Sequence, residues 1–226
     1  MRGRFGHIGR VLFGCSGLLA ANAASATVID SASYFTSIPH THITWELDGA
    51  GAPVSLMQGQ SLVMPVNEYA TLGLLFENQV RWVNDGAGAF DAAQTLGGAS
   101  MNNAIPSAFV NSFAFTFTVP VRSFGFWIAN NRGADPAGPT IQAFDASGNL
   151  LGSVQFAGSL IDGSVTVGGV TADYGFMGLE TTTDVARVVV TKQAAILDDL
   201  RYSAVPAPGT TALLGLMGLA ALRRRR

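Results

Sequence analysis

Two histidines stand two residues apart in the segment PHTHITWELD, as His40 and His42. Side chains two residues apart on a β-strand point to the same face, so both imidazoles would be available to one metal ion. A third ligand is not evident, because His7 lies near the N-terminus and Glu46 or Asp48 could contribute only through loop geometry. The alternative, which the sequence favours, is a pair of exposed polar side chains on a strand.

Two neighbouring carboxylates, Asp198 and Asp199, occur in the segment ILDDLRYS. On a regular strand they would point to opposite faces, so one of them could line a metal site near the last strand. Calcium is the ion that a resemblance to calcium-containing carbohydrate-binding sandwiches suggests for this site. The alternative is a charged residue at a sheet edge next to a turn residue.

Three tryptophans supply indole rings of the kind on which sugar rings stack. Trp127 lies in the apolar run FGFWIA and is expected in the core, whereas Trp45 lies in the segment PHTHITWELD. Trp82 is followed closely by Asn84 and Asp85, which makes this segment the better candidate for a glycan-binding or calcium-binding loop. Core packing is the alternative for Trp82.

Catalytic motifs are missing from the sequence. It contains no G-x-S-x-G, no H-E-x-x-H and no phosphate-binding loop. Asp145 with Asp162 or Asp173 could be imagined as a pair of catalytic carboxylates, but each lies in turn-like sequence beside Gly or Ser. We therefore expect a protein that is not an enzyme, with no resident cofactor except calcium as the cation that the acidic residues could take.

The charge distribution argues against a nucleic-acid partner. Only 12% of the residues are charged, and seven of the 13 basic residues lie at the two ends of the chain. All 15 acidic residues lie between Asp30 and Asp199, so the interior carries a formal charge of about −9. A polyanion would be repelled by such a domain, whereas a neutral glycan or a calcium ion would not.

Residues 27–204, which contain these candidate site residues, have the periodicity of β-strands. In SFAFTFTVPV, Phe113, Phe115 and Phe117 alternate with small or polar residues, which predicts a half-buried strand that Pro120 ends or borders. Further strands are expected at 27–35, 61–64, 73–76, 79–83, 123–129, 140–144, 150–156, 174–180, 186–192 and 195–203, and a helical turn is an open alternative at 91–99. Short strands without intervening helices predict an all-β domain over 27–204, an antiparallel β-sandwich of jelly-roll or Greek-key type.

The N-terminus has the features of a signal peptide. Arg2, Arg4 and Arg10 precede an apolar stretch at 11–21, and ANAASA follows. Ala24 and Ala26 form an A-x-A site that predicts cleavage by signal peptidase after Ala26, with Ala23 as the second choice. A buried first helix is the alternative, and Cys15, the only cysteine, gives a weak lipoprotein pattern. Cleavage after Ala26 leaves a mature domain without cysteines.

The C-terminal segment VPAPGTTALLGLMGLAALRRRR has a separate organisation. Two prolines favour an extended segment that a protease can bind, and residues 210–222 form an apolar helix candidate that rises only about 20 Å. Arg223, Arg224, Arg225 and Arg226 would stop that helix on the cytoplasmic side of the membrane. The alternatives are a permanent single-span anchor and a buried apolar segment of the domain.

Both ends, together with the phrases NEYATLGLLFEN, FTVPVRSFGFWI, IQAFDASGNLLGSV and ILDDLRYS, resemble PEP-CTERM proteins, an exported class of Gram-negative bacteria. The resemblance implies that an exosortase recognises the motif Val205, Pro206, Ala207 and Pro208, in which Ala207 stands where the family has Glu. It implies a protein that is exported, held briefly in the inner membrane, and then released to the cell surface or extracellular matrix, in association with exopolysaccharide and biofilm. The alternative function is that of a carbohydrate-binding module, with or without calcium.

Overall fold

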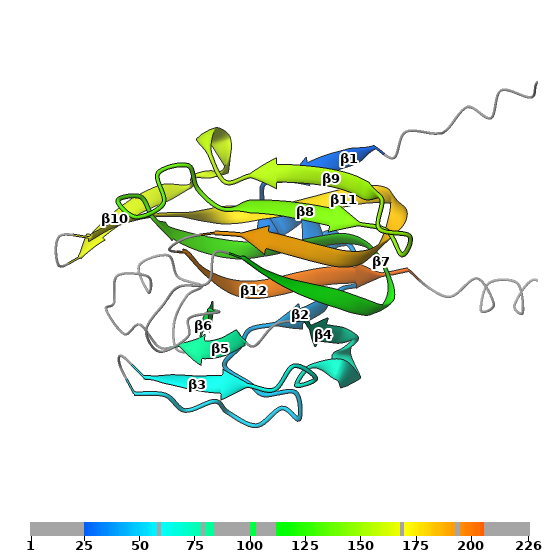
Figure 1. The fold of residues 1–226 in the computed structure, drawn as a ribbon, viewed down its shortest axis with the longest axis horizontal. Coiled ribbons are helices and arrows are strands. Elements are labelled where there is room, and N and C mark those ends of the chain that lie inside the picture. Colours follow the sequence, from blue (N-terminus) through cyan, green and yellow to red (C-terminus); the bar gives the residue numbers. More distant parts are fainter. Residues whose placement is uncertain are drawn as a thin grey trace, which may run out of the picture.

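The computed structural model describes residues 25–57, 60–77, 80–83, 100–102, 112–167, 170–192 and 195–205. Every pairing between the described strands is antiparallel, which confirms the prediction of an antiparallel β fold (Figure 1). The jelly-roll or Greek-key type stays a prediction. The strands are β1 (Ala26–Ile29), β2 (Thr41–Ile43), β3 (Ser61–Met64), β4 (Leu74–Phe76), β5 (Val80–Val83), β6 (Ser100–Asn102), β7 (Ser112–Asn131), β8 (Thr140–Phe144), β9 (Leu150–Gln155), β10 (Gly163–Val167), β11 (Val170–Thr191) and β12 (Ala195–Ala204).

Helical structure in the described residues is limited to the 3-10 turns η1 (Ala32–Ser37), η2 (Ala70–Leu72) and η4 (Gly158–Leu160). None of these is long and apolar enough to cross a membrane. The predicted signal peptide through Ala24, the helical turn at 91–99 and the tail from Pro206 onward lie outside the described residues.

Two long strands, β7 and β11, run through the whole domain and pair with each other along both of their halves. Ser112 to Thr116 pair with Thr191 to Arg187, and Ser123 to Asn131 pair with Glu180 to Ala172. The register shifts between these two stretches. The expectation that Pro120 would end a strand was wrong: the strands predicted at 113–119 and 123–129 are one, and Pro120 lies at the irregularity, where the ladder requires no N–H donor.

The two halves of these long strands have different outer neighbours. The first half of β7 pairs with β4, and the last part of β11 pairs with β8 and through it with β9. The second half of β7 pairs with β12, while the first part of β11 pairs with β1 and β10. Two contacts show that the halves pack against each other. The Phe117 and Tyr202 rings lie 5.0 Å apart, and a Cβ atom on Gly152 of β9 would collide with Ala26 of β1.

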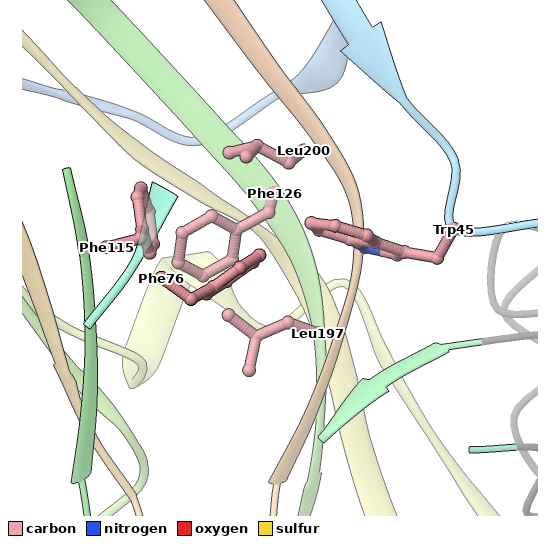
Figure 2. Close-up of a pocket in the computed structure, with 6 residues that line it drawn as sticks. All are labelled: Trp45, Phe76, Phe115, Phe126, Leu197 and Leu200. Atoms are coloured by element: carbon pink, nitrogen blue, oxygen red, sulfur yellow. The ribbon is translucent and has the colours of Figure 1, made fainter. Parts of the chain in front are cut away.

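The core between these halves is aromatic, as the alternating pattern of the phenylalanines predicts. Figure 2 shows six of its side chains converging on a space too narrow for a water molecule. They are Trp45, Phe76, Phe115, Phe126, Leu197 and Leu200. On the opposite face of the second half of β7, Trp127 packs against Phe176, which η1 covers with Phe35. The sheet is therefore apolar on both faces in this region.

Near the N-terminus, the strand predicted at 27–35 is shorter than expected. It ends at Ile29, and η1 begins where the side chain of Ser31 accepts a hydrogen bond from the N–H of Ser33. The strands at 61–64 and 140–144 have the predicted bounds. The glycine-containing strand β10 was not predicted.

Candidate functional site

The short strand β2 lies beside the last strand, β12, whose pairing with β7 is interrupted between Asp198 and Arg201. His42 is opposite Arg201 and Ile43 is opposite Leu200. Just beyond this pairing, Asp199 and Trp45 have φ angles of 52° and 67°, the positive values among described residues other than glycine. A left-handed backbone costs roughly 1–2 kcal/mol in such residues and tends to occur at functional sites. The interruption therefore marks this region as a candidate site.

The side chains at this interruption form a charged group, which we call the His42 cluster (His42, Asp199 and Arg201). The Nε2 atom of His42 lies 2.9 Å from Oδ1 of Asp199, and Nη2 of Arg201 lies 3.5 Å from Oδ2 of the same carboxylate. Asp199 and Arg201 are largely buried, whereas His42 is about one-third exposed. With Nε2–H donating to the carboxylate, Nδ1 is the ring atom of His42 that can meet a ligand.

Two further carboxylates shape the surroundings of the His42 cluster. Asp198 is fully buried, and its Oδ1 accepts a hydrogen bond of 2.8 Å from the N–H of Asp199, which holds the left-handed turn. Burial raises the pKa of the Glu46 carboxyl, and the nearby charge of Asp199 raises it further. Both effects favour a protonated Glu46 relative to an exposed glutamate.

A hollow of about 340 Å³ opens next to His42. We call it the hollow; its walls come from the end of β2, the loop that follows it, and the segment around η2. It is lined by His42, Ile43, Thr44, Leu47, Asp48, Gly49, Ala50, Gly51, Tyr69 and Leu72. Leu47 and Leu72 are 46% and 40% exposed, so the hollow offers apolar surface as well as polar groups.

One wall of the hollow is a small hairpin whose tip is rich in glycine. Leu47 pairs with Pro53, and the Oδ1 atom of Asp48 accepts hydrogen bonds from the N–H groups of Ala50 and Ala52 at 2.9 and 2.8 Å. A Cβ atom on Gly49 would collide with the main-chain oxygen of Glu68, so glycine is needed for this close approach. The hairpin tip is therefore held by its own carboxylate and by its contact with the segment before η2.

The hairpin is fixed to the core by a chain of hydrogen bonds. The hydroxyl of Tyr69 donates to the main-chain oxygen of Leu47 at 2.7 Å and accepts from Nε1 of Trp82 at 3.1 Å. Burial raises the pKa of Tyr69, so its hydroxyl stays protonated and able to donate. The hydroxyl of Tyr202 donates to the main-chain oxygen of Leu72 on the other side of the hollow.

Trp82 is not placed as the glycan-binding prediction requires. It is only 4% exposed, and its indole is part of the core, so its ring faces cannot stack on a ligand. Asn84 and Asp85 lie outside the described residues. Trp82 contributes to the hollow only indirectly, through its hydrogen bond to Tyr69.

The predicted metal ligands are arranged differently from what the sequence suggested. The His40 and His42 rings lie 6.4 Å apart, but His42 contacts Asp199, whereas Nδ1 of His40 contacts the main-chain oxygen of Ile38. Asp198 and Asp199 do not alternate across a regular strand, because β12 is irregular between Asp198 and Arg201. Among the described residues, no three His, Cys, Asp or Glu side chains converge as metal ligands would.

Comparisons with known proteins include two distant structural likenesses. No family model matches this chain, and no curated protein matches it. A Caldicellulosiruptor saccharolyticus module, CBM27-1, solved with mannohexaose, is 12% identical over 66% of this chain and 99% of its own, with a TM-score of 0.36. The mannan-recognising module TmCBM27 is 9% identical over 80% of this chain and 96% of its own, with a TM-score of 0.28. At these TM-scores neither likeness bears on what this chain binds.

Proposed function

We propose that this domain binds a neutral polysaccharide in the hollow beside His42. The observation that carries the proposal is the composition of that hollow: exposed leucine side chains next to an imidazole, a carboxylate and the main chain of a glycine-rich hairpin. Its volume is in the range of roughly 300–1,000 Å³ that small ligands and sugar units fill. The acidic interior of the sequence argues for an uncharged ligand.

Each part of a sugar ring has a suitable partner in the hollow. Leu47 and Leu72 offer apolar surface to the C–H groups of a ring, while Nδ1 of His42 and the carboxylate of Asp48 can hydrogen-bond hydroxyl groups. Asp199 orients the imidazole and the hairpin hydrogen bonds fix Asp48, so little ordering accompanies binding. In this proposal the sugar ring contacts leucine side chains and oriented polar groups instead of the tryptophan ring that the sequence suggested.

Binding is tested by affinity electrophoresis and calorimetry of the purified protein against mannan, xylan, galactan and β-glucan, with and without a calcium chelator. His42→Ala and Leu72→Ala should each weaken binding at least tenfold. Leu150→Ala is the matched control, since Leu150 is exposed on β9 and does not line the hollow, and it should bind as the wild type does. Absence of binding to every polysaccharide, or equal binding by all variants, would reject the proposal.

We also propose that the protein reaches the cell surface through its tail, as the PEP-CTERM resemblance implies. The support in the domain is the position of the motif: the N–H of Val205 donates to the main-chain oxygen of Pro120 at 2.8 Å, and Pro206 follows directly. The folded domain thus anchors Val205, the first residue of the motif. Exosortase would release it outward, where exopolysaccharide is the expected partner.

This second proposal is tested by mapping both termini of the protein isolated from the cell surface. Signal peptidase and exosortase processing predicts an N-terminus at Thr27 or Ala24 and loss of Arg223 to Arg226. Because Ala26 is already paired with Thr181 in β1, the structure favours the cut that retains it. An intact arginine tail on surface-located protein would contradict exosortase processing.

A further inference from the structure

The only lysine of the 226-residue chain is buried. Lys192 is 1% exposed, at the junction between β11 and β12, whereas the other 12 basic residues are all arginines. A lysine side chain is almost never fully buried unless a partner compensates for the loss of water. Buried polar groups are therefore expected near the amine of Lys192.

Two more buried polar residues, Asp135 and Asn130, accompany this lysine, and we call the three residues the Lys192 cluster. Asp135 is 4% exposed, and its negative charge favours the charged form of the Lys192 amine. Asn130, in β7, is 3% exposed, and its Nδ2 donates to the main-chain oxygen of Asp135 at 2.9 Å. Asn130 also pairs with Ala195, three residues after Lys192, so the sheet brings these segments together.

Burial changes the protonation equilibrium of Lys192 and the hydrogen bonding of Asn130 relative to exposed side chains. Burial lowers the pKa of Lys192 to about 8, although the charge of Asp135 acts in the opposite direction. A lowered pKa increases the neutral fraction of the amine, and a neutral amine is a nucleophile. The Oδ1 atom of Asn130 is buried and has no hydrogen-bond partner among the described residues, so its side-chain amide is the polar group of this cluster that is least satisfied.

We propose that Lys192 and Asn130 react to form an amide bond between their side chains, with Asp135 as the proton carrier. The Nζ atom attacks Cγ of Asn130, a new C–N bond forms, and the original bond from Cγ to Nδ2 breaks. Asp135 takes a proton from the attacking amine and returns it to the departing nitrogen, which leaves as ammonia. The step consumes an amine and a carboxamide and yields a substituted amide and ammonia, so it needs no oxidant and no second substrate.

Such a bond would join β7 covalently to the junction of β11 and β12. The mature domain predicted from the signal peptide has no cysteine, so a disulfide is not available to it. The cross-link closes the segment from Asn130 to Lys192, and restricts the unfolded chain in the way that a disulfide does. A domain exposed outside the cell would gain resistance to unfolding and proteolysis.

The proposal is tested by the intact mass of the wild-type protein after both termini have been mapped. We expect the sequence mass minus one ammonia, and no ε-amine that an amine-reactive reagent can label in denaturant. Trypsin should yield a branched product that joins peptide 123–132 to peptide 188–201, because cleavage after Lys192 is blocked. The full sequence mass, or cleavage and labelling at Lys192, would overturn the proposal.

Other products are distinguished in the same digest. Loss of one water with peptide 133–187 joined to 188–201 would assign the bond to Asp135 and overturn the role of Asn130. Ammonia lost within one linear peptide would indicate a succinimide and would also overturn the proposal. Asp135→Asn, which removes the proton carrier, should show the unmodified mass; Lys192→Arg provides the uncross-linked reference. If either variant fails to fold, the wild-type mass alone decides.

Discussion

The hydroxyl of Tyr69 connects the wall of the hollow to the core, and Tyr69→Phe removes it with little change in shape. The change leaves the indole N–H of Trp82 without its acceptor at a site that is almost fully buried, and the main-chain oxygen of Leu47 without its donor. An unsatisfied buried donor costs about 1–3 kcal/mol, and we take about 2 kcal/mol because the oxygen of exposed Leu47 can turn to water. For a domain of this size that corresponds to a fall in Tm of about 4–8 °C.

The assay is urea denaturation and thermal unfolding followed by circular dichroism, with polysaccharide binding measured alongside. Tyr174→Phe is the matched control, since this half-buried tyrosine packs against the small cluster of Ala129 and Ile196 and does not line the hollow. It should change stability by no more than about 0.5 kcal/mol. If Tyr69→Phe is as stable as this control, the hydrogen bonds from Trp82 to Tyr69 and from Tyr69 to Leu47 do not hold the hairpin.

Two further predictions concern the rest of the domain. Gly138→Ala should destabilise by about 2–4 kcal/mol in urea, because Gly138 has a φ of +76° and a Cβ atom would collide with the main-chain oxygen of Phe156; Gly148→Ala, at a φ of +81° in open space, should cost only about 1 kcal/mol. Burial alone would raise the pKa of Asp173, but hydrogen bonds from Arg132 and Ser164 hold it below its usual value. The stability that this carboxylate adds is present above its unfolded pKa of about 3.9 and is lost as the pH falls through its lower folded pKa. The stability advantage of wild type over Asp173→Asn should therefore shrink below about pH 4, and an advantage that does not change with pH would contradict it.

The strands were predictable because their burial pattern is local. Alternation of phenylalanine with small residues identifies the face of β7 that forms the core, and the bounds of β3 and β8 follow from similar patterns. The continuity of β7 through Pro120 was not predictable, because it depends on where β11 shifts its register, a property of the partner strand.

The candidate site was predictable only in its separate parts. The sequence singles out His42 and Asp199, but each was considered with its neighbour in sequence, whereas the structure joins them across 157 positions. Nothing local signals that Asp199 adopts a left-handed backbone or that Arg201 faces the same carboxylate. The hollow had one available signal, the segment LDGAGAP, whose composition is typical of a tight turn. For Trp82 the local sequence was misleading, because its polar neighbours suggested an exposed ring and the ring is buried.

The most direct test of polysaccharide binding in the hollow is residue-level NMR of the isotope-labelled protein. An oligosaccharide of whichever polysaccharide binds in the panel is titrated, and the backbone amide shifts are followed. Binding in the hollow predicts the largest changes at Gly49, Ala50 and Gly51 and at His42, with amides of β8 and β9 unaffected. Shift changes centred on another face of the sheet, or none at saturating ligand, would contradict the account.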